Sequence, residues 1–274
     1  MSPFSLEGGA IDAWVNPNIG LPAAKAAEVA YLFPEMAARN ARGTTLEQLI
    51  DEMDEAGITK ALMCSGYGGA DNIDWVRKAV ATHPDRFASS AVVDPRKGMA
   101  TVRLVEDLVR NENCRLIRML ALETEIPYND ARYYPVYTKC AELGVPVGLN
   151  VGIPGPRVPG KYQHPLTVDE VCSFFPELSV VLQHGGEPWE ALCVKLMVKY
   201  PRLYYMTSAF APKYIPKVIL DYANTRGAER IMYASDYPLL SLARCMDEAV
   251  NLPFRDQERF DLFIRGNAQA LFFS

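Results

Sequence analysis

The stretch SVVLQHGGEPWEALCVKLMVKYP, residues 179–201, contains one complete unit of the predicted fold. It begins with a short apolar run that a Gly-Gly pair closes, which is typical of a buried strand ending in a turn. It continues with apolar residues three and four positions apart and stops at a proline, which indicates an amphipathic helix. The same order recurs along the chain, from AIDAWVN (10–16) and TTLEQLIDEMDEAG (44–57) to RIMYASDYP (230–238) and LSLARCMDEAV (240–250).

Eight such pairs follow one another within 274 residues, without a proline-rich or low-complexity linker. Strands that alternate with helices favour a parallel sheet, and eight pairs in about 250 residues are typical of a closed (β/α)8 barrel. We therefore predict an α/β fold, a TIM barrel that forms a single domain over residues 1–274. The segment from Pro17 to Arg42 is too long for a plain loop. It predicts an insertion after the first strand that acts as a lid or rim, with Tyr31, Arg39 and Arg42 as candidate contacts.

The composition argues against several kinds of partner. The chain is 49% hydrophobic and 22% charged, with 28 Lys and Arg against 33 Asp and Glu and a net charge of -5. Because no long basic run is present, we do not expect nucleic acid as a partner. No segment approaches the ~20 apolar residues of a membrane span, and the first residues do not resemble a signal peptide, so we expect a cytoplasmic protein. The six cysteines are widely spaced without a CxxC pair, which favours buried thiols over disulfides or zinc.

The active site of such a barrel lies at the carboxyl ends of its strands. Asp12, Trp14 and Asn16 occupy alternate positions at the end of the first strand, so we predict that they form one row with Asn16 at the mouth. The ends of the other strands contribute further polar residues to the same predicted ring: Cys64, Asp94, Arg118, Asn150, His184, Ser208 and Asp236.

Six motifs in the same order make the chain resemble a known family. They are AIDAWVN, where the family has IDxHxH; ASSAVVDPR (88–96), where it has a strand ending in DPR; DARYYPVYTKCAELGVPVGLNVG (130–152), where it has a helix followed by LPVxxHxG; LQHGGEPW (182–189); ASDYP (234–238); and the closing helix GNAQALFF (266–273). The sequence resembles the second amidohydrolase family, which includes aminocarboxymuconate semialdehyde decarboxylase and resorcylate decarboxylase relatives. The resemblance implies a hydrolase or carboxy-lyase on a TIM barrel with a C-terminal helix.

The resemblance also implies where a metal would bind. Metal-using members have ligands at both His of the first strand, at a His ending the fifth strand and at the Asp ending the eighth. Those positions here hold Trp14, Asn16, Asn150 and Asp236. An indole has no lone pair to offer, and an amide oxygen is a poor zinc ligand. We therefore predict no cofactor; the alternative is one divalent metal, Zn or Mn, held by His184, Asp236 and His164 at an altered site.

His184 and Asp236 are the predicted catalytic pair. An imidazole and a carboxylate at one rim can position a water or move a proton near neutral pH without a metal. The family offers a precedent, a pyrone dicarboxylate lactonase that hydrolyses its ester with an Asp-activated water. The competing interpretations are a satisfied core histidine for His184 and a structural N-cap for Asp236.

Arg118 is the predicted anchor for an anionic substrate, because a cation in the apolar strand CRLIRMLAL (114–122) is costly without an anion. Arg115 is nearer the start of that strand and is expected to form a salt bridge at the opposite face. A structural ion pair of Arg118 with Asp94 or Glu123 is the alternative. The remaining predicted substrate contacts are Trp14, Asn16, Asn150 and Ser208, and Cys64 is expected to be a buried structural thiol rather than a second nucleophile.

These residues favour a metal-independent enzyme that hydrolyses a small, anionic, ring-containing or conjugated carboxylic acid or lactone. One alternative is a decarboxylase of an aromatic or unsaturated carboxylic acid. A second alternative is a catalytically inactive barrel with a binding role. An isologous homodimer is the expected assembly, since it is the commonest for soluble proteins.

Overall fold

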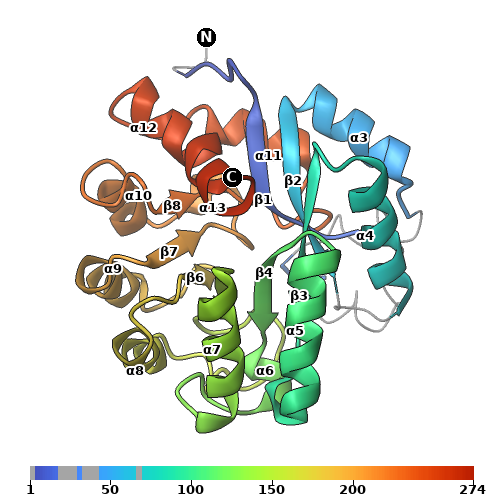
Figure 1. The fold of residues 1–274 in the computed structure, drawn as a ribbon. Helices are drawn as coiled ribbons and strands as arrows, with labels where there is room; N and C mark the ends of the chain where they lie inside the picture. The colour runs from blue at the N-terminus through green and yellow to red at the C-terminus, as the bar shows by residue number, and fades with distance from the viewer. Residues whose placement is uncertain (1–3, 18–29, 33–42, 66–69) are drawn as a thin grey trace.

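The computed structural model describes residues 4–17, 30–32, 43–65 and 70–274. Its strands form one eight-stranded sheet in which each strand pairs in parallel with the next along the chain (Figure 1). The strands are β1 (Ala10–Val15), β2 (Ile58–Ser65), β3 (Phe87–Val92), β4 (Cys114–Met119), β5 (Val147–Asn150), β6 (Val180–Gln183), β7 (Leu203–Met206) and β8 (Ile231–Met232).

The end of β1 meets the segment just after β8 and nearly closes the sheet into a barrel. Val15 forms a parallel bridge with Tyr237, just beyond β8. The N–H of Asp236 donates to the carbonyl of Trp14 at 3.1 Å, and the N–H of Asn16 donates to the carbonyl of Tyr237 at 2.8 Å. The predicted (β/α)8 barrel is confirmed, and its closing seam lies next to the residues that the first and eighth strands contribute to the predicted site.

Helices surround the sheet and follow the strands in the predicted alternation (Figure 1). They are α3 (Leu46–Glu55), α4 (Ala70–Thr82), α5 (Met99–Asn111), α6 (Ala121–Thr124), α7 (Tyr134–Leu143), α8 (Leu166–Phe174), α9 (Glu190–Lys199), α10 (Lys217–Ala223), α11 (Leu242–Ala249), α12 (Gln257–Asp261) and α13 (Asn267–Phe272). The C-terminal helix α13 confirms the helix expected at 266–273. The short α6 and α12, and a π-helical turn at Leu262–Gly266, had no clear signal in the sequence.

Helix α3 illustrates how the sequence specifies these elements. Thr45 accepts a hydrogen bond from the backbone N–H of Gln48, whose side chain accepts one from the N–H of Thr45, so a capping box starts the helix. Leu46, Leu49 and Met53 lie on one face and are buried. Their spacing of three and four residues turns that face toward the barrel.

The apolar core has two parts. A large outer cluster fills the space between the sheet and the helices. A smaller inner cluster fills the barrel, so the interior is packed rather than open. Its buried members are Ile11, Ala13, Trp14, Leu62, Cys64, Ala88, Leu116, Val181, Met206, Met232, Ala234, Ala268 and Phe272.

Most of the predicted insertion between Pro17 and Arg42 lies outside the described residues, including Arg39 and Arg42. Tyr31 is described, and its hydroxyl donates to the carbonyl of Gly155 while its ring lies 4.8 Å from the Cζ atom of Arg157. The segment around Tyr31 therefore contacts the long connection that follows β5.

All six cysteines are buried and free, as the sequence predicts. Within the described ranges, no helix is both long enough and apolar enough to cross a membrane.

Candidate active site

The end of β1 departs from simple strand alternation. The pairing register between β1 and β2 shifts between Asp12 and Val15. Trp14 joins Ile11 and Ala13 in the inner cluster. Asp12 instead uses Oδ1 to accept hydrogen bonds from the N–H of Trp14 at 3.0 Å and of Ser235 at 2.9 Å. The prediction of a single row was therefore wrong for Asp12, because the register shift breaks the two-residue period and this carboxyl serves the backbone of β1 and of the segment after β8.

Trp14 lies at the centre of the candidate site. The Cζ atom of Arg118 lies 3.5 Å from the centroid of the indole, which is a cation–π contact. The imidazole of His184 lies 4.4 Å from the indole, centroid to centroid, with a tilt of 50°. Trp14 thus contacts Arg118 of β4 and His184 just after β6, and it stands where the resemblance would place a metal-binding histidine.

Arg118 is a buried cation that forms no ion pair within the described residues, although the charge of Asp236 acts on it. Its side chain is 2% exposed, and Nε and Nη1 have no hydrogen-bond partner there. The alternative ion pair with Asp94 is wrong, because that carboxylate binds Arg96 at 2.8 Å. No ion pair with Glu123 forms in the described part either. Burial lowers the pKa of Arg118, but a guanidinium remains protonated in proteins. The site therefore holds a positive charge with unused donors.

His184 follows β6 and pairs with Ser208, which follows β7. Nδ1 of His184 lies 2.9 Å from Oγ of Ser208, and the backbone N–H of His184 donates to the same Oγ at 3.2 Å. Burial lowers the pKa of His184 to about 3, and the positive charge of Arg118 acts in the same direction. The imidazole is therefore neutral at physiological pH.

Asp236 follows β8 and is 4% exposed. Its Oδ1 accepts a hydrogen bond from Nδ2 of Asn16 at 3.0 Å, and the same Nδ2 donates to the carbonyl of Tyr237 at 2.9 Å. Burial raises the pKa of Asp236 to about 6, against the opposing effects of the Asn16 hydrogen bond, the charge of Arg118 and the nearby Trp14 indole. Its carboxylate is mostly ionised at neutral pH and can still accept a proton there.

The backbone at these strand ends has an unusual conformation. His184, Ala209 and Asp236 have φ values of +62°, +73° and +63°, in the left-handed region that non-glycine residues rarely adopt. Such residues cost about 1–3 kcal/mol each and cluster at functional sites. Gly185 follows His184 at φ +81°, and a Cβ there would lie 2.1 Å from the ring of Phe210. The His-Gly pair therefore allows Phe210 to pack directly on the backbone beside the imidazole.

His184 and Asp236 lie at the same end of the barrel but do not touch through a hydrogen bond or ion pair within the described residues. Trp14 contacts His184 by its ring, and its carbonyl accepts the N–H of Asp236. The predicted pair is therefore two separate groups around one indole. The pKa of His184 is lowered and that of Asp236 is raised. Near neutral pH the imidazole is therefore neutral, and the carboxylate can accept a proton.

Asn150 ends β5 next to Gln183 of β6, its partner in the strand register. Both amides have a buried oxygen without a hydrogen-bond partner in the described part of the chain: Oδ1 of Asn150 and Oε1 of Gln183. Gln183 was not predicted as a site residue. A Cβ at Gly148 would lie 2.6 Å from its amide, so that glycine gives it room. The only sequence signal was an amide at the end of the apolar run VVLQ (180–183).

The metal alternative fits these side chains poorly. The described residues contain no group of three His, Cys, Asp or Glu that could hold a metal ion. His164 is used elsewhere: its Nδ1 accepts the N–H of Leu166 at 3.1 Å, and its ring packs on Trp189 at a centroid distance of 4.4 Å. Both Nδ1 and the ring of His164 are therefore engaged by local contacts. What the mouth offers is an indole, two amides and one carboxylate at the family's ligand positions, a donor set poorly suited to zinc.

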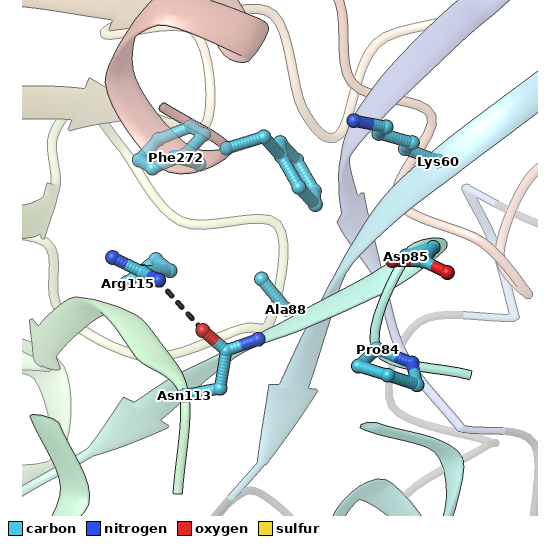
Figure 2. A pocket seen from close by; sticks show the side chains of 8 residues that line it. Lys60, Pro84, Asp85, Ala88, Asn113, Arg115 and Phe272 are labelled. Carbon is cyan, nitrogen blue, oxygen red and sulfur yellow. Dashed lines mark hydrogen bonds between the residues drawn. The ribbon is translucent and has the colours of Figure 1, made fainter. Parts of the chain in front are cut away.

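A separate hollow of about 330 Å³ lies at the opposite end of the barrel, where the strands begin (Figure 2). Its lining residues are Lys60, Pro84, Asp85, Ala88, Asn113, Arg115, Phe272 and Phe273. Arg115 was expected to form a salt bridge at this face; it instead donates from Nε to Oδ1 of Asn113 at 2.8 Å. None of the predicted site residues lines this hollow.

Residues 11–273 match the family model described as Amidohydrolase. The chain belongs to the amidohydrolase family. This match confirms the family inferred from the six motifs and supports the prediction of an enzyme, whether hydrolase or carboxy-lyase. No curated protein is similar enough in sequence to match the chain.

Solved structures share the fold of this amidohydrolase. A TIM-barrel protein of Bordetella bronchiseptica, described as uncharacterized, is 23% identical, with a TM-score of 0.81 over 96% of this chain and 97% of that one. The 5-carboxyvanillate decarboxylase of Novosphingobium aromaticivorans, complexed with manganese and a nitrobenzoic acid, is 16% identical, with a TM-score of 0.74 over 97% and 96%. A probable 2-pyrone-4,6-dicarboxylic acid hydrolase of Acinetobacter baumannii, with citric acid bound, is 16% identical, with a TM-score of 0.68 over 96% and 98%.

Proposed function

We propose that this amidohydrolase is an enzyme that hydrolyses a small, anionic, ring-containing or conjugated carboxylic acid or lactone without a metal. Asp236 is the general base and His184 a neutral acid or electrophile. Arg118 anchors the substrate carboxylate, with Asn16, Asn150 and Trp14 as further contacts. The observation that carries this proposal is the buried guanidinium of Arg118, which packs on Trp14 with two unused donors.

Burial of Arg118 carries an energetic cost that a bound anion would offset. A buried charge without a partner is strongly unfavourable, and such groups persist where a ligand compensates for them. A carboxylate can accept hydrogen bonds from a guanidinium, and the indole beneath it offers a flat apolar surface for a ring. The location of Arg118 at the end of β4 agrees with the end of the barrel where TIM-barrel chemistry takes place.

Asp236 supplies a base suited to neutral pH. A carboxylate with a pKa of about 6 is mostly ionised at neutral pH and is a better proton acceptor than an ordinary aspartate. In lactone hydrolysis it removes a proton from a water whose oxygen bonds to the ester carbon. The ring C–O bond then breaks, and the leaving oxygen takes the proton back. Donors from Arg118 and His184 stabilise the negative oxygen that forms in between.

We propose metal independence because the side chains at the family's ligand positions form a donor set poorly suited to zinc. An indole and amides replace three expected ligands, and Nδ2 of Asn16 occupies one oxygen of Asp236. The relative that carries manganese shows that metal use occurs on this fold. Elemental analysis of protein purified without added metal, together with activity in a chelator, tests this part. Near-stoichiometric zinc or manganese would overturn it.

Decarboxylation is the second candidate, favoured by the similarity to 5-carboxyvanillate decarboxylase. Here a ring carbon takes a proton from protonated Asp236 as its bond to the carboxyl carbon breaks and CO2 leaves. Arg118 and Trp14 would hold an aromatic acid in the same way as a lactone acid. Both reactions use the same anchor and the same carboxyl group.

Product analysis separates the candidates. The purified enzyme is incubated with 2-pyrone-4,6-dicarboxylate and, separately, with 5-carboxyvanillate, and CO2 and ring-opened acid are quantified. Ring-opened acid without CO2 supports hydrolysis, and stoichiometric CO2 rejects it in favour of decarboxylation. A barrel with only a binding role predicts neither product, and it predicts that Asp236→Asn and His184→Ala leave biological function unchanged.

A further inference from the structure

Ser208 reaches the candidate site through its contact with His184. Its side chain is fully buried at 0% exposure, in the segment after β7. Its hydroxyl lies 2.9 Å from Nδ1 of His184, which is itself only partly buried. A ligand that enters the mouth therefore meets the imidazole, and the imidazole meets Ser208. This geometry favours a role for Ser208 that acts through His184.

The donors and acceptors around Oγ of Ser208 give the direction of its hydrogen bond with Nδ1 of His184. A serine hydroxyl has one hydrogen to donate and two lone pairs. The backbone N–H of His184 already donates to Oγ at 3.2 Å. Within the described residues, the only acceptor in hydrogen-bonding contact with Oγ is Nδ1. The hydroxyl hydrogen therefore points to Nδ1, and a neutral imidazole that accepts at Nδ1 carries its proton on Nε2.

We infer that Ser208 is a positioning residue that holds His184 as the neutral Nε2–H tautomer. This inference deepens the proposed function: His184 then acts on the substrate as a hydrogen-bond donor, not as a base. The hydroxyl of Ser208 donates to Nδ1, so the N–H at Nε2 is the ring group that can bind a ligand. Asp236 remains as the base of the site.

The surroundings of the ring support this role. The Trp14 indole packs at 4.4 Å, and the left-handed backbone at φ +62° sets the direction of the side chain. Burial and the charge of Arg118 keep the imidazole neutral. Arg118 and His184 then both present N–H groups, so the substrate atom that they meet is an oxygen carrying negative charge.

The tautomer can be measured without a substrate. The chain has only three histidines, His83, His164 and His184, so ¹⁵N–¹H long-range NMR correlations can be assigned with single substitutions to Asn. We expect His184 to show a protonated Nε2 and an unprotonated Nδ1 from about pH 6 to about pH 8. A protonated Nδ1, or an imidazolium, in the wild-type protein would overturn the inference.

A matched pair of variants tests the contribution of Ser208. Ser208→Ala removes the hydroxyl, and the Nδ1 signal of His184 should move toward that of a nitrogen without a hydrogen bond. Thr207→Val is the control: Thr207 is equally buried, but its hydroxyl donates to the carbonyl of Met232 and accepts the N–H of Ala234. The control should leave the His184 signals in place. An unchanged Nδ1 signal in Ser208→Ala would contradict the positioning role.

Kinetics gives a second readout once a substrate is turned over. Loss of one hydrogen bond to the imidazole should lower kcat about tenfold, with a smaller change in KM and no shift in the acid limb that Asp236 sets. Ser208→Cys keeps a weak donor and should recover part of the rate. Equal kcat in wild type and Ser208→Ala would contradict the inference. If the NMR result holds but neither candidate substrate reacts, the proposed function fails and the tautomer assignment stands.

Discussion

The two ends of the barrel treat charged side chains in different ways. At the carboxyl end, Arg118 is buried with unused donors beside a carboxyl group, Asp236, whose pKa is raised. At the amino end, Arg115 comes from the same strand, is exposed, and donates to the neutral side chain of Asn113 (Figure 2). The two arginines are separated by only three positions in the sequence.

This contrast shows how burial increases the effect of a charged side chain on its neighbours. Water solvates Arg115, so its charge costs little and changes its neighbours little. Arg118 has lost that solvation, and its charge lowers the pKa of both His184 and Asp236. A protein retains such a cost where function requires it. If the two ends differ in this way, substitutions at the carboxyl end should change activity more than matched substitutions at the amino end.

The largest effect should come from the base. Asp236→Asn keeps the shape of the side chain and removes its ability to accept a proton, so kcat should fall by about 10²–10⁴-fold. Asp85→Asn, at the rim of the opposite hollow, is the control and should retain wild-type kcat. Steady-state kinetics with the substrate identified by product analysis measures both. Retained activity in Asp236→Asn would remove it from the mechanism.

The two arginines allow a direct comparison. Arg118→Met should lower kcat/KM about 100-fold, because a charged hydrogen bond to the substrate is lost. The same change should leave the free energy of unfolding unchanged or raise it by about 1–3 kcal/mol, since an unpaired buried charge is replaced by an apolar chain. Arg115→Met should alter neither quantity much. Kinetics and denaturant unfolding test both variants, and a large loss of stability in Arg118→Met would indicate a structural role.

The stability of the fold should depend on pH through the buried carboxyls at the β1–β8 seam. Burial raises the pKa of Asp12 to about 7 and that of Asp236 to about 6. At pH values between the ordinary carboxyl pKa and these raised pKa values, the folded state binds more protons than the unfolded state. Their contribution to stability is therefore complete at acid pH and is lost as the pH rises toward about 7.

Asp12→Asn tests this dependence. Its amide oxygen can still accept the N–H groups of Trp14 and Ser235, while Oδ2, which has no partner in the described part, becomes an amide nitrogen. We expect a smaller loss of stability with rising pH, by about 1.4 kcal/mol for each unit of pKa shift removed. Urea unfolding at several pH values measures it. An unchanged slope would show that Asp12 is not the responsible group.

The smallest effect should come from Cys64, although it lies at the same end as Arg118. Burial raises the pKa of its thiol to about 11, and the hydroxyl of Ser90 donates to Sγ at 3.4 Å. The thiol is therefore protonated and unreactive. Cys64→Ala should keep kcat within about twofold, and wild-type activity should resist thiol reagents. Rapid inactivation that this substitution abolishes would restore Cys64 as a nucleophile.

Much of the fold could be predicted, because each strand and helix carries its own local signal. The apolar runs, the three-and-four spacing of Leu46, Leu49 and Met53, and the Thr45 cap are visible without tertiary structure. The short α6 and α12 were missed because elements of four or five residues contain less than two turns of pattern. The homodimer and the cytoplasmic location remain predictions.

The sequence nominated residues that the structure brings together, but it did not predict how they contact one another. Strand ends and family motifs were enough to nominate Trp14, Asn16, Arg118, His184 and Asp236. The contacts among these residues were not predictable from the sequence. The sequence also placed Asp12 in the same row as Trp14, and the register shift in β1 breaks that row. Gln183 was missed, since an amide at a strand end has no distinctive pattern until its buried oxygen is seen.

The sequence by itself determined the order of strands and helices, the family, and the loss of histidines at three expected metal positions. These properties depend on residue identity and on spacing along the chain. Only the tertiary structure decided that Arg118 packs on Trp14 without an ion pair in the described residues, that Ser208 contacts Nδ1 of His184, and that Asp12 serves the backbone. Those outcomes depend on distances between residues of different strands and on exclusion of water, and both arise only when the barrel closes.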